Sequence, residues 1–391
     1  MTELILDVDW LVTCAQTMAG LQDFGEASWR EGLERYVTAL REEAALSALG
    51  VQIAAGEILM YLANRLAVTD WHRRHPEMAE RDVRPPIVIV GMGRTGTTIL
   101  HDLLAQDPAH RAPLTWEVDQ PCPPPESATY DTDPRIAEAQ ARIDRNVELV
   151  PALQSTHPLG ARLAQECIRL MGSDFRSIAF GTQYRIPSYC QWLLYQADMA
   201  PTYRWHRRFL QLLQWRHSAE RWVLKSPGHL WALPTLLAEY PNALLVQTHR
   251  DPLYVTASLG SLMGTLRGLT SDQASMAEAA TEFAEYIIEG LNRAVTARQD
   301  GTVAASRVVD VQFGAFMADP FQTLRGIYER LGIALTPTAE QRMRRFLAEH
   351  TRDKHGRHEY RFADTGLDAG ALRERARRYQ EYFDVPSEPL P

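Results

Sequence analysis

The sequence predicts a three-layer α/β/α protein, in which helices cover both faces of a central parallel sheet. Apolar runs at 87–90, 222–225, 243–248 and 307–311 alternate with amphipathic helical segments, the pattern of parallel strands joined by helical crossovers. The chain has 391 residues, of which 45% are hydrophobic and 23% charged. This length and composition allow one large globular domain with insertions.

Helical segments flank and interrupt these strands. Residues 1–80 are expected to form an N-terminal helical extension, because apolar residues recur at helical spacing around Trp10, over 29–40 with Ser28 as a cap, and over 46–66. The main domain is then expected to span 81–391. Within it, helices over 132–153, 161–172 and 201–218 predict a helical insertion over about 130–220, and the proline-rich stretch 113–125 is expected to be irregular.

Composition excludes several classes of function. A formal net charge of -8 argues against a general binder of nucleic acid or of membrane surfaces. The four cysteines form no C-x-x-C pair, so a zinc or redox motif has no support. The acidic N-terminus does not resemble a signal peptide, and no apolar run approaches the ~18 residues of a membrane span. We therefore expect a cytoplasmic protein, with a homodimer as the default assembly.

The most informative motif is the glycine-rich loop at 91–98, GMGRTGTT, which follows the first strand and opens a helix. It nearly matches the phosphate-binding pattern G-x-x-x-x-G-K-[ST], but Thr97 replaces the lysine and Arg94 is the only cation. Helix N-termini bind anions, and arginine contacts phosphate or sulfate oxygens at two points. A P-loop-like fold follows from this unit. The anion-binding candidates are Gly93, Arg94, Thr95, Gly96, Thr97 and Thr98. The alternative is a turn that only connects strand to helix.

Two further strand ends carry polar residues. Lys225 ends one strand and His229 opens the next helix, where it could act as a base or make only local hydrogen bonds. Arg250 ends the following strand, and Ser258 lies about two turns into its helix. Ligands of open parallel sheets bind at the carboxyl ends of the strands, so these residues are expected to share one crevice. A local ion pair between Arg250 and Asp251 is the competing interpretation.

Together, the glycine loop, Lys225 to His229 and Arg250 to Ser258 resemble the sulfotransferases that use 3′-phosphoadenosine 5′-phosphosulfate (PAPS), especially a bacterial branch. The resemblance covers roughly 85–365. It implies that the loop holds the 5′-phosphosulfate, that Arg250 and Ser258 hold the 3′-phosphate, and that adenosine 3′,5′-bisphosphate is the product, without a metal. A P-loop nucleotide kinase or hydrolase with an altered loop is the alternative, although the chain offers no clear magnesium-binding aspartate at a strand end.

The resemblance leaves the catalytic base open among His229, Glu117 and Glu166, with His229 slightly preferred for a hydroxyl acceptor. Glu166 is expected inside an apolar helix, where burial would raise its pKa, or else as a buried partner of Arg162, Arg169 or a backbone group. Arg94 and Lys225 complete the catalytic candidates. Gly356 and Arg357, in a basic turn, are candidates for the 3′-phosphate side. The acceptor is expected to be a hydroxyl, or an amine, of a small molecule or lipid, and the sequence does not identify it.

Overall fold

The computed structural model, which describes residues 6–149, 159–350 and 360–390, contains the predicted parallel sheet. Its strands are β1 (Pro86–Val90), β2 (His110–Arg111), β3 (Arg221–Lys225), β4 (Leu244–His249) and β5 (Val308–Gln312). The strand order is β2-β3-β1-β4-β5, and every neighbouring pair is parallel. Since β1 lies between β3 and β4, the loop after β1 is flanked by the residues that end the other two strands.

Both faces of the sheet are apolar, as expected for parallel strands under helices. Val88 of β1 and Leu224 of β3 belong to one core with α12 (Ala200–Gln214), α13 (Leu233–Glu239), α14 (Pro252–Arg267) and α15 (Met276–Gln299). Ile87 and Val223, one residue earlier on the same strands, point to the opposite core with α5 (Thr97–Leu104), α17 (Pro320–Leu331) and α18 (Pro337–Glu349). The three-layer prediction is therefore confirmed.

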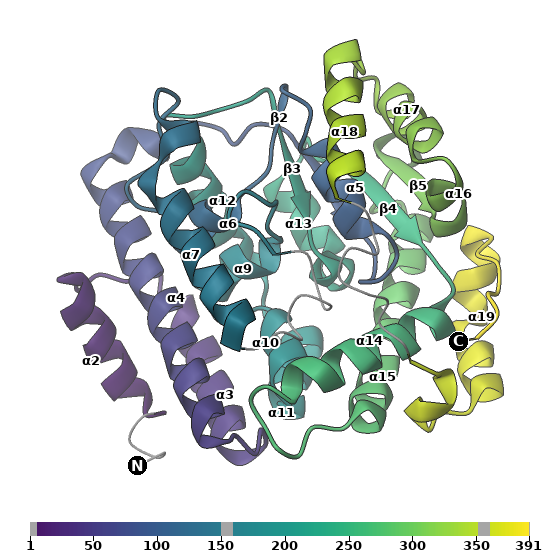
Figure 1. The fold of residues 1–391 in the computed structure, drawn as a ribbon, viewed down its shortest axis with the longest axis horizontal. Coiled ribbons are helices and arrows are strands. Elements are labelled where there is room, and N and C mark those ends of the chain that lie inside the picture. The colour runs from purple at the N-terminus through teal and green to yellow at the C-terminus, as the bar shows by residue number, and fades with distance from the viewer. Residues whose placement is uncertain (1–5, 150–158, 351–359, 391) are drawn as a thin grey trace.

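The remaining helices form a layer beside the sheet and a C-terminal cover. The N-terminal helices lie on the left of Figure 1 and the last helix lies on the right. The layer consists of α2 (Val8–Ala19), α3 (Ser28–Glu42), α4 (Ala48–Arg74), α6 (Thr115–Asp119), α7 (Pro134–Leu149), α9 (Cys167–Gly172), α10 (Ala179–Gln183) and α11 (Pro187–Tyr195). The C-terminal side carries α16 (Phe313–Ala318) and α19 (Ala369–Phe383).

The N-terminal helices share one hydrophobic core with the inserted helices. Residues of α2, α3 and α4 pack in a single cluster with aromatic residues of 175–194. The aromatic residues Phe180, Tyr184 and Trp192 lie in this core, where Phe180 stacks on Tyr36 of α3 and the Tyr184 ring lies tilted beside it. Aromatic residues at helical spacing in this insertion therefore serve packing.

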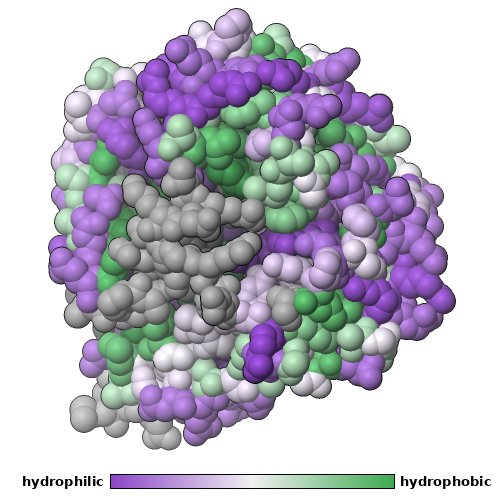
Figure 2. Space-filling model, turned by 45° about the vertical axis from the view of Figure 1, so that its right-hand side comes forward, coloured by the Kyte–Doolittle hydropathy of each residue, from purple (hydrophilic) through white to green (hydrophobic). Residues whose placement is uncertain are grey.

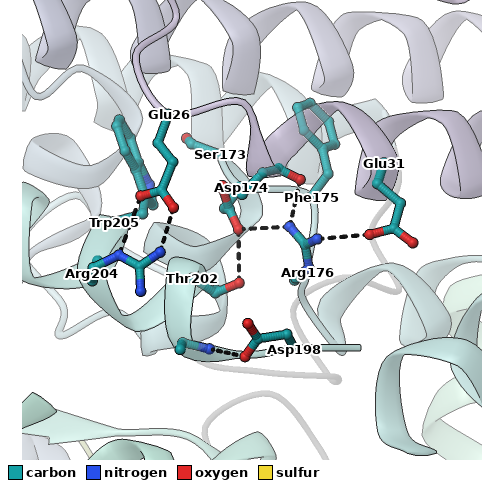
Figure 3. Close-up of polar contacts among 12 residues, drawn as sticks. Glu26, Glu31, Ser173, Asp174, Phe175, Arg176, Asp198, Thr202, Arg204 and Trp205 are labelled. Carbon is teal, nitrogen blue, oxygen red and sulfur yellow. Dashed lines mark hydrogen bonds and ion pairs between the residues drawn. The ribbon is translucent and has the colours of Figure 1, made fainter. Parts of the chain in front are cut away.

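A buried ionic network joins the same elements (Figure 3). Asp174 is fully buried and forms ion pairs with Arg65 of α4 at 2.9 Å and with Arg176 at 3.1 Å. It also accepts hydrogen bonds from Ser28 at 2.6 Å and from Thr202 of α12 at 2.7 Å. Ser28 is the first residue of α3 and not its cap, which is Ala27, and its hydroxyl donates to Asp174.

Local predictions fail where tertiary contacts decide the structure. The helix expected over 161–172 begins only at Cys167, and the stretch 113–125 contains the short helix α6. The two-residue strand β2 has no sequence signal of its own and pairs with the start of β3.

The face drawn in Figure 2 is largely hydrophilic along its right-hand and upper edges and carries separate hydrophobic patches elsewhere. No helix within the described ranges is long and apolar enough to cross a membrane.

Candidate active site

The glycine loop between β1 and α5 is held tightly against the end of β4. Gly91 has φ 143° and Gly96 has φ 87°, both in the region that favours glycine. A Cβ atom on Gly91 would lie 2.2 Å from Oγ1 of Thr248, so no other residue fits without a shift. The hydroxyl of Thr95 donates to the carbonyl of Met92 at 2.6 Å and contacts the Thr248 hydroxyl at 2.6 Å. These contacts set the loop in one position.

The loop ends at the N-terminus of α5. The first backbone bond of this helix runs from Leu100 to Gly96 at 3.1 Å, so the N–H groups of 97–99 have no partner within the helix. The helix dipole adds positive potential at the same point. Thr97 is buried and Thr98 is partly exposed. This terminus has the chemistry of an anion site.

Lys225, at the end of β3, reaches the same point. Its Nζ lies 3.4 Å from Oγ1 of Thr98 and forms an ion pair with Glu166. The Lys225 side chain is 2% exposed and that of Glu166 16%, so the pair is almost shielded from water but open on the carboxylate side. Asp102 of α5 lies in the electrostatic environment of the pair, and burial raises its pKa to about 7. The helix N-terminus, a lysine and a carboxylate thus meet at one end of the loop.

Arg94 points to the other end of the loop. It has φ 69°, and its Nε donates to Oγ of Ser258 on α14 at 2.9 Å. Ser258 and Tyr254 also contact the Tyr360 hydroxyl, whose pKa burial raises to about 12. Arg250 donates to the Arg94 carbonyl at 3.0 Å. The structure therefore places the Arg94 side chain beside Ser258 and Arg250, the two residues expected at the 3′-phosphate, although the resemblance grouped Arg94 with the 5′-phosphosulfate loop.

The local ion pair between Arg250 and Asp251, which was the competing interpretation, does not form. Arg250 instead binds Glu388 of the C-terminal tail with two hydrogen bonds, at 2.8 and 2.9 Å. Asp251 binds Arg373 of α19, at 2.6 and 3.0 Å. Each residue of the dipeptide is thus paired with the C-terminal part of the chain.

The three candidate bases lie in different environments. Glu166 precedes the first residue of α9 and is not inside a helix, and it forms its ion pair with Lys225, whereas Arg162 and Arg169 pair with aspartates. Glu117 is fully buried, where it pairs with Arg111 and accepts the N–H of Leu114 at 2.9 Å. The Glu117 carboxylate thus binds the N–H of the residue that precedes α6 and holds the start of this helix.

His229 is also fully buried. Its Nδ1 contacts the Tyr203 hydroxyl at 2.7 Å, and among the described residues its Nε2 has no hydrogen-bond partner. Burial, and secondarily the nearby His206, lower the pKa of His229 to about 3. The imidazole is therefore neutral at ordinary pH and packed in the core.

Two predicted residues, Gly356 and Arg357, lie outside the described residues. Sequence reasoning missed Asp102 and Glu388. Asp102 occurs in a helix with no motif around it, and Glu388 occurs in a tail whose position depends on the whole fold. Only their proximity to Lys225 and Arg250 reveals them. Across 6–149, 159–350 and 360–390, no three His, Cys, Asp or Glu side chains form a group suited to a metal ion.

Known proteins resemble this chain both in sequence and in structure. The model of the Sulfotransferase family matches residues 85–337. The omega-hydroxy-beta-dihydromenaquinone-9 sulfotransferase of Mycobacterium bovis is 27% identical over 270 residues, which cover 68% of this chain and 67% of that protein. This relative and the family match favour the sulfotransferase interpretation over the kinase or hydrolase alternative.

Two solved structures are similar over nearly the whole chain. Sulfotransferase STF9 from Mycobacterium avium has a TM-score of 0.87 and 30% identity, covering 97% of each chain. Sulfotransferase STF1 from Mycobacterium tuberculosis has a TM-score of 0.84 and 32% identity, covering 94% of this chain and 98% of that one. The similarity therefore includes the N-terminal and inserted helices as well as the sheet.

Proposed function

Because the chain belongs to the sulfotransferase family, we propose that it transfers the sulfuryl group from PAPS to a hydroxyl group on an apolar acceptor. The observation that carries the donor assignment is the division of the glycine loop into two ends. One end has the helix N-terminus, Thr98 and Lys225, and the other has Arg94, Arg250 and Ser258. A donor with a phosphosulfate and a separate 3′-phosphate needs two such anion sites.

At the first end, the loop N–H groups and Thr98 would bind the 5′-phosphosulfate. As the acceptor oxygen bonds to sulfur, the bond from sulfur to the bridging oxygen breaks and negative charge builds on the leaving phosphate. The Lys225 ammonium lies 3.4 Å from the Thr98 hydroxyl and would stabilise that charge. The acceptor proton must leave at the same time.

Glu166 is the base that this arrangement favours. Its carboxylate lies beside Lys225 and is partly exposed, so an acceptor hydroxyl can reach it. The proton of the hydroxyl would pass to a Glu166 oxygen, while the leaving phosphate keeps its electron pair. Glu117 and His229 are fully buried and already bonded to neighbouring core groups.

At the second end, Arg94, Arg250 and Ser258 would bind the 3′-phosphate. Arginine binds phosphate through parallel N–H bonds, and a serine hydroxyl adds a neutral donor. The acceptor proposal rests on the relative from Mycobacterium bovis, whose name describes a hydroxylated menaquinone as its substrate. A long-chain alcohol or a hydroxylated lipid is the corresponding class here. A cytoplasmic location and a homodimer stay predictions.

The donor assignment is tested by calorimetric titration of adenosine 3′,5′-bisphosphate into the purified enzyme. We expect binding, and we expect Arg250→Ala to weaken it roughly 30-fold, the equivalent of about 2 kcal/mol for a lost charged hydrogen-bond pair. Arg342→Ala, on the exposed surface of α18, is the matched control and should bind as the wild type does. Failure of the wild type to bind at millimolar concentrations would overturn the donor.

The base is tested separately, with labelled PAPS and a series of alcohols of increasing chain length. Glu166→Gln should lower kcat by about 100-fold or more, because the proton acceptor is lost, and should retain bisphosphate binding, because the Lys225 ammonium stays in place. Glu329→Gln, at an exposed position of α17, is the control. Wild-type turnover in Glu166→Gln would exclude this residue as the base.

A further inference from the structure

The guanidinium of Arg250 is occupied on every side that the described residues reach. Nε and Nη2 donate to the two carboxylate oxygens of Glu388 at 2.8 and 2.9 Å, and Nη1 donates to the Arg94 carbonyl at 3.0 Å. Its carbon lies 3.7 Å from the centre of the Tyr254 ring and 3.8 Å from that of Phe313. The Arg250 side chain is only 10% exposed as a result.

The C-terminal tail holds Glu388 in this position through its backbone. The N–H of Glu388 donates to Asp251 at 2.7 Å, and the same carboxylate oxygen of Asp251 accepts from Arg373 at 3.0 Å. Upstream in the tail, the Val385 carbonyl accepts from the Gln380 side chain at 3.1 Å. The tail is thus fixed to Asp251, the neighbour of Arg250 in the sequence. This anchoring places the Glu388 carboxylate against the Arg250 guanidinium.

We propose that Glu388 is a specificity-determining residue of the donor site. Its carboxylate occupies the edge of Arg250 formed by Nε and Nη2, where the 3′-phosphate would otherwise bind. This inference rests on the proposed function. A carboxylate and a phosphate bind the paired N–H groups of arginine in the same parallel geometry. The 3′-phosphate and Glu388 therefore compete for the same edge, and the donor must displace the carboxylate to use it.

Glu388 weakens binding of the 3′-phosphate even if the phosphate does not fully displace its carboxylate from Arg250. A phosphate that bound the remaining Nη1 and Nη2 hydrogens would still lie near the Glu388 carboxylate, and like charges repel. A unit charge 4 Å away in a water-like medium contributes about 1 kcal/mol, which corresponds to about a 5-fold change in affinity. Either arrangement makes the negative charge of Glu388 a penalty on 3′-phosphorylated nucleotides.

The test is calorimetric titration of wild type and Glu388→Gln, in the full-length chain, with adenosine 3′,5′-bisphosphate and with adenosine 5′-phosphate. Glutamine has nearly the same size and keeps the backbone bond to Asp251. We expect the variant to bind the bisphosphate about 5-fold more tightly at low ionic strength and to bind the monophosphate as the wild type does. Glu381→Gln, whose side chain is 72% exposed on α19, is the matched control and should change neither affinity.

The outcomes separate this inference from the proposed function. If the wild type binds the bisphosphate and Glu388→Gln binds it equally or more weakly, Glu388 does not compete and the inference fails alone. Equal gains for both nucleotides also overturn it, because the effect would not involve the 3′-phosphate. If neither protein binds the bisphosphate, the proposed donor fails and the inference fails with it.

Discussion

Asp102 is an acidic residue whose side chain is buried like that of a core residue. It is 6% exposed on α5, and burial raises its pKa to about 7 even though the positive charge of Lys225 acts in the opposite direction. Burial is the main reason that its ionised form is disfavoured, and the nearby Glu166 carboxylate adds a smaller repulsion. At neutral pH this residue is divided between its neutral and charged forms.

This raised pKa predicts how stability depends on pH. The folded protein keeps the Asp102 proton up to about pH 7, whereas the unfolded chain releases it near the ordinary value of 3.8, so this carboxyl lowers the free energy of unfolding as pH rises through that window. Asp102→Asn removes the penalty. We expect the variant to gain on the order of 2–4 kcal/mol relative to wild type between pH 4 and pH 8.

Urea unfolding at the two pH values measures this gain, with Asp82→Asn, whose side chain is 99% exposed, as the control. A difference between Asp102→Asn and wild type that stays constant with pH would show that Asp102 ionises normally in the folded protein.

The candidate residues show what a sequence can and cannot predict at this scale. Arg94, Lys225, Arg250 and Ser258 follow strand ends, and parallel strands bring such positions to one edge, so their convergence was predictable. The three candidate bases differ only in burial and partners, which the sequence does not encode locally. Glu388 lies 138 positions from Arg250, and no spacing rule connects them.

Among the elements, the long strands and amphipathic helices were predictable because their apolar pattern agrees with their final packing. The exceptions are elements created by neighbours. β2 has two residues and exists by pairing with β3, and α6 is held by the buried contacts of Glu117 with Arg111 and Leu114. The glycine loop was also predictable. Its backbone has positive φ at Gly91 and Gly96, a conformation that favours glycine, so the sequence carries a visible signal for it.

The loop yields a prediction at this scale. Gly91→Ala would place a Cβ atom 2.2 Å from the Thr248 hydroxyl and 2.9 Å from its carbonyl, at φ 143°. The strand end or the loop must then shift, and we expect a loss of roughly 2–4 kcal/mol in the free energy of unfolding together with the loss of bisphosphate binding.

Gly326→Ala in the middle of α17 is the control, because nothing lies within 4 Å of its new Cβ atom and alanine favours helix. It should stabilise the protein by about 1 kcal/mol and leave binding unchanged. Equal stability of Gly91→Ala and wild type would show that the loop can relax.

On the scale of the whole molecule, the expected N-terminal extension is bound to the main domain by more than surface contact. Its helices share a core with the inserted helices, and Arg65 of α4 is 1% exposed. The Arg65 guanidinium donates to the carbonyls of Phe24, Glu26 and Ser173 and stacks on Trp205, and burial lowers its pKa to about 10. Asp174 supplies the balancing charge from the insertion.

Asp174→Asn therefore tests whether 1–80 folds with the rest of the chain. The substitution leaves the guanidinium groups of Arg65 and Arg176 without their shared carboxylate, and removing one partner from a buried ion pair costs roughly 3–5 kcal/mol.

If the network joins the N-terminal helices and the sheet into one cooperative unit, native-state hydrogen exchange should accelerate by the same factor in α4 and in β1. Asp198→Asn is the control, because Asp198 is exposed and, among the described residues, its side chain accepts one hydrogen bond, from the Ala200 N–H at 2.9 Å, so the substitution should cost about 1 kcal/mol or less. Faster exchange in α4 with unchanged exchange in β1 would show instead that residues 1–80 unfold as a separate unit.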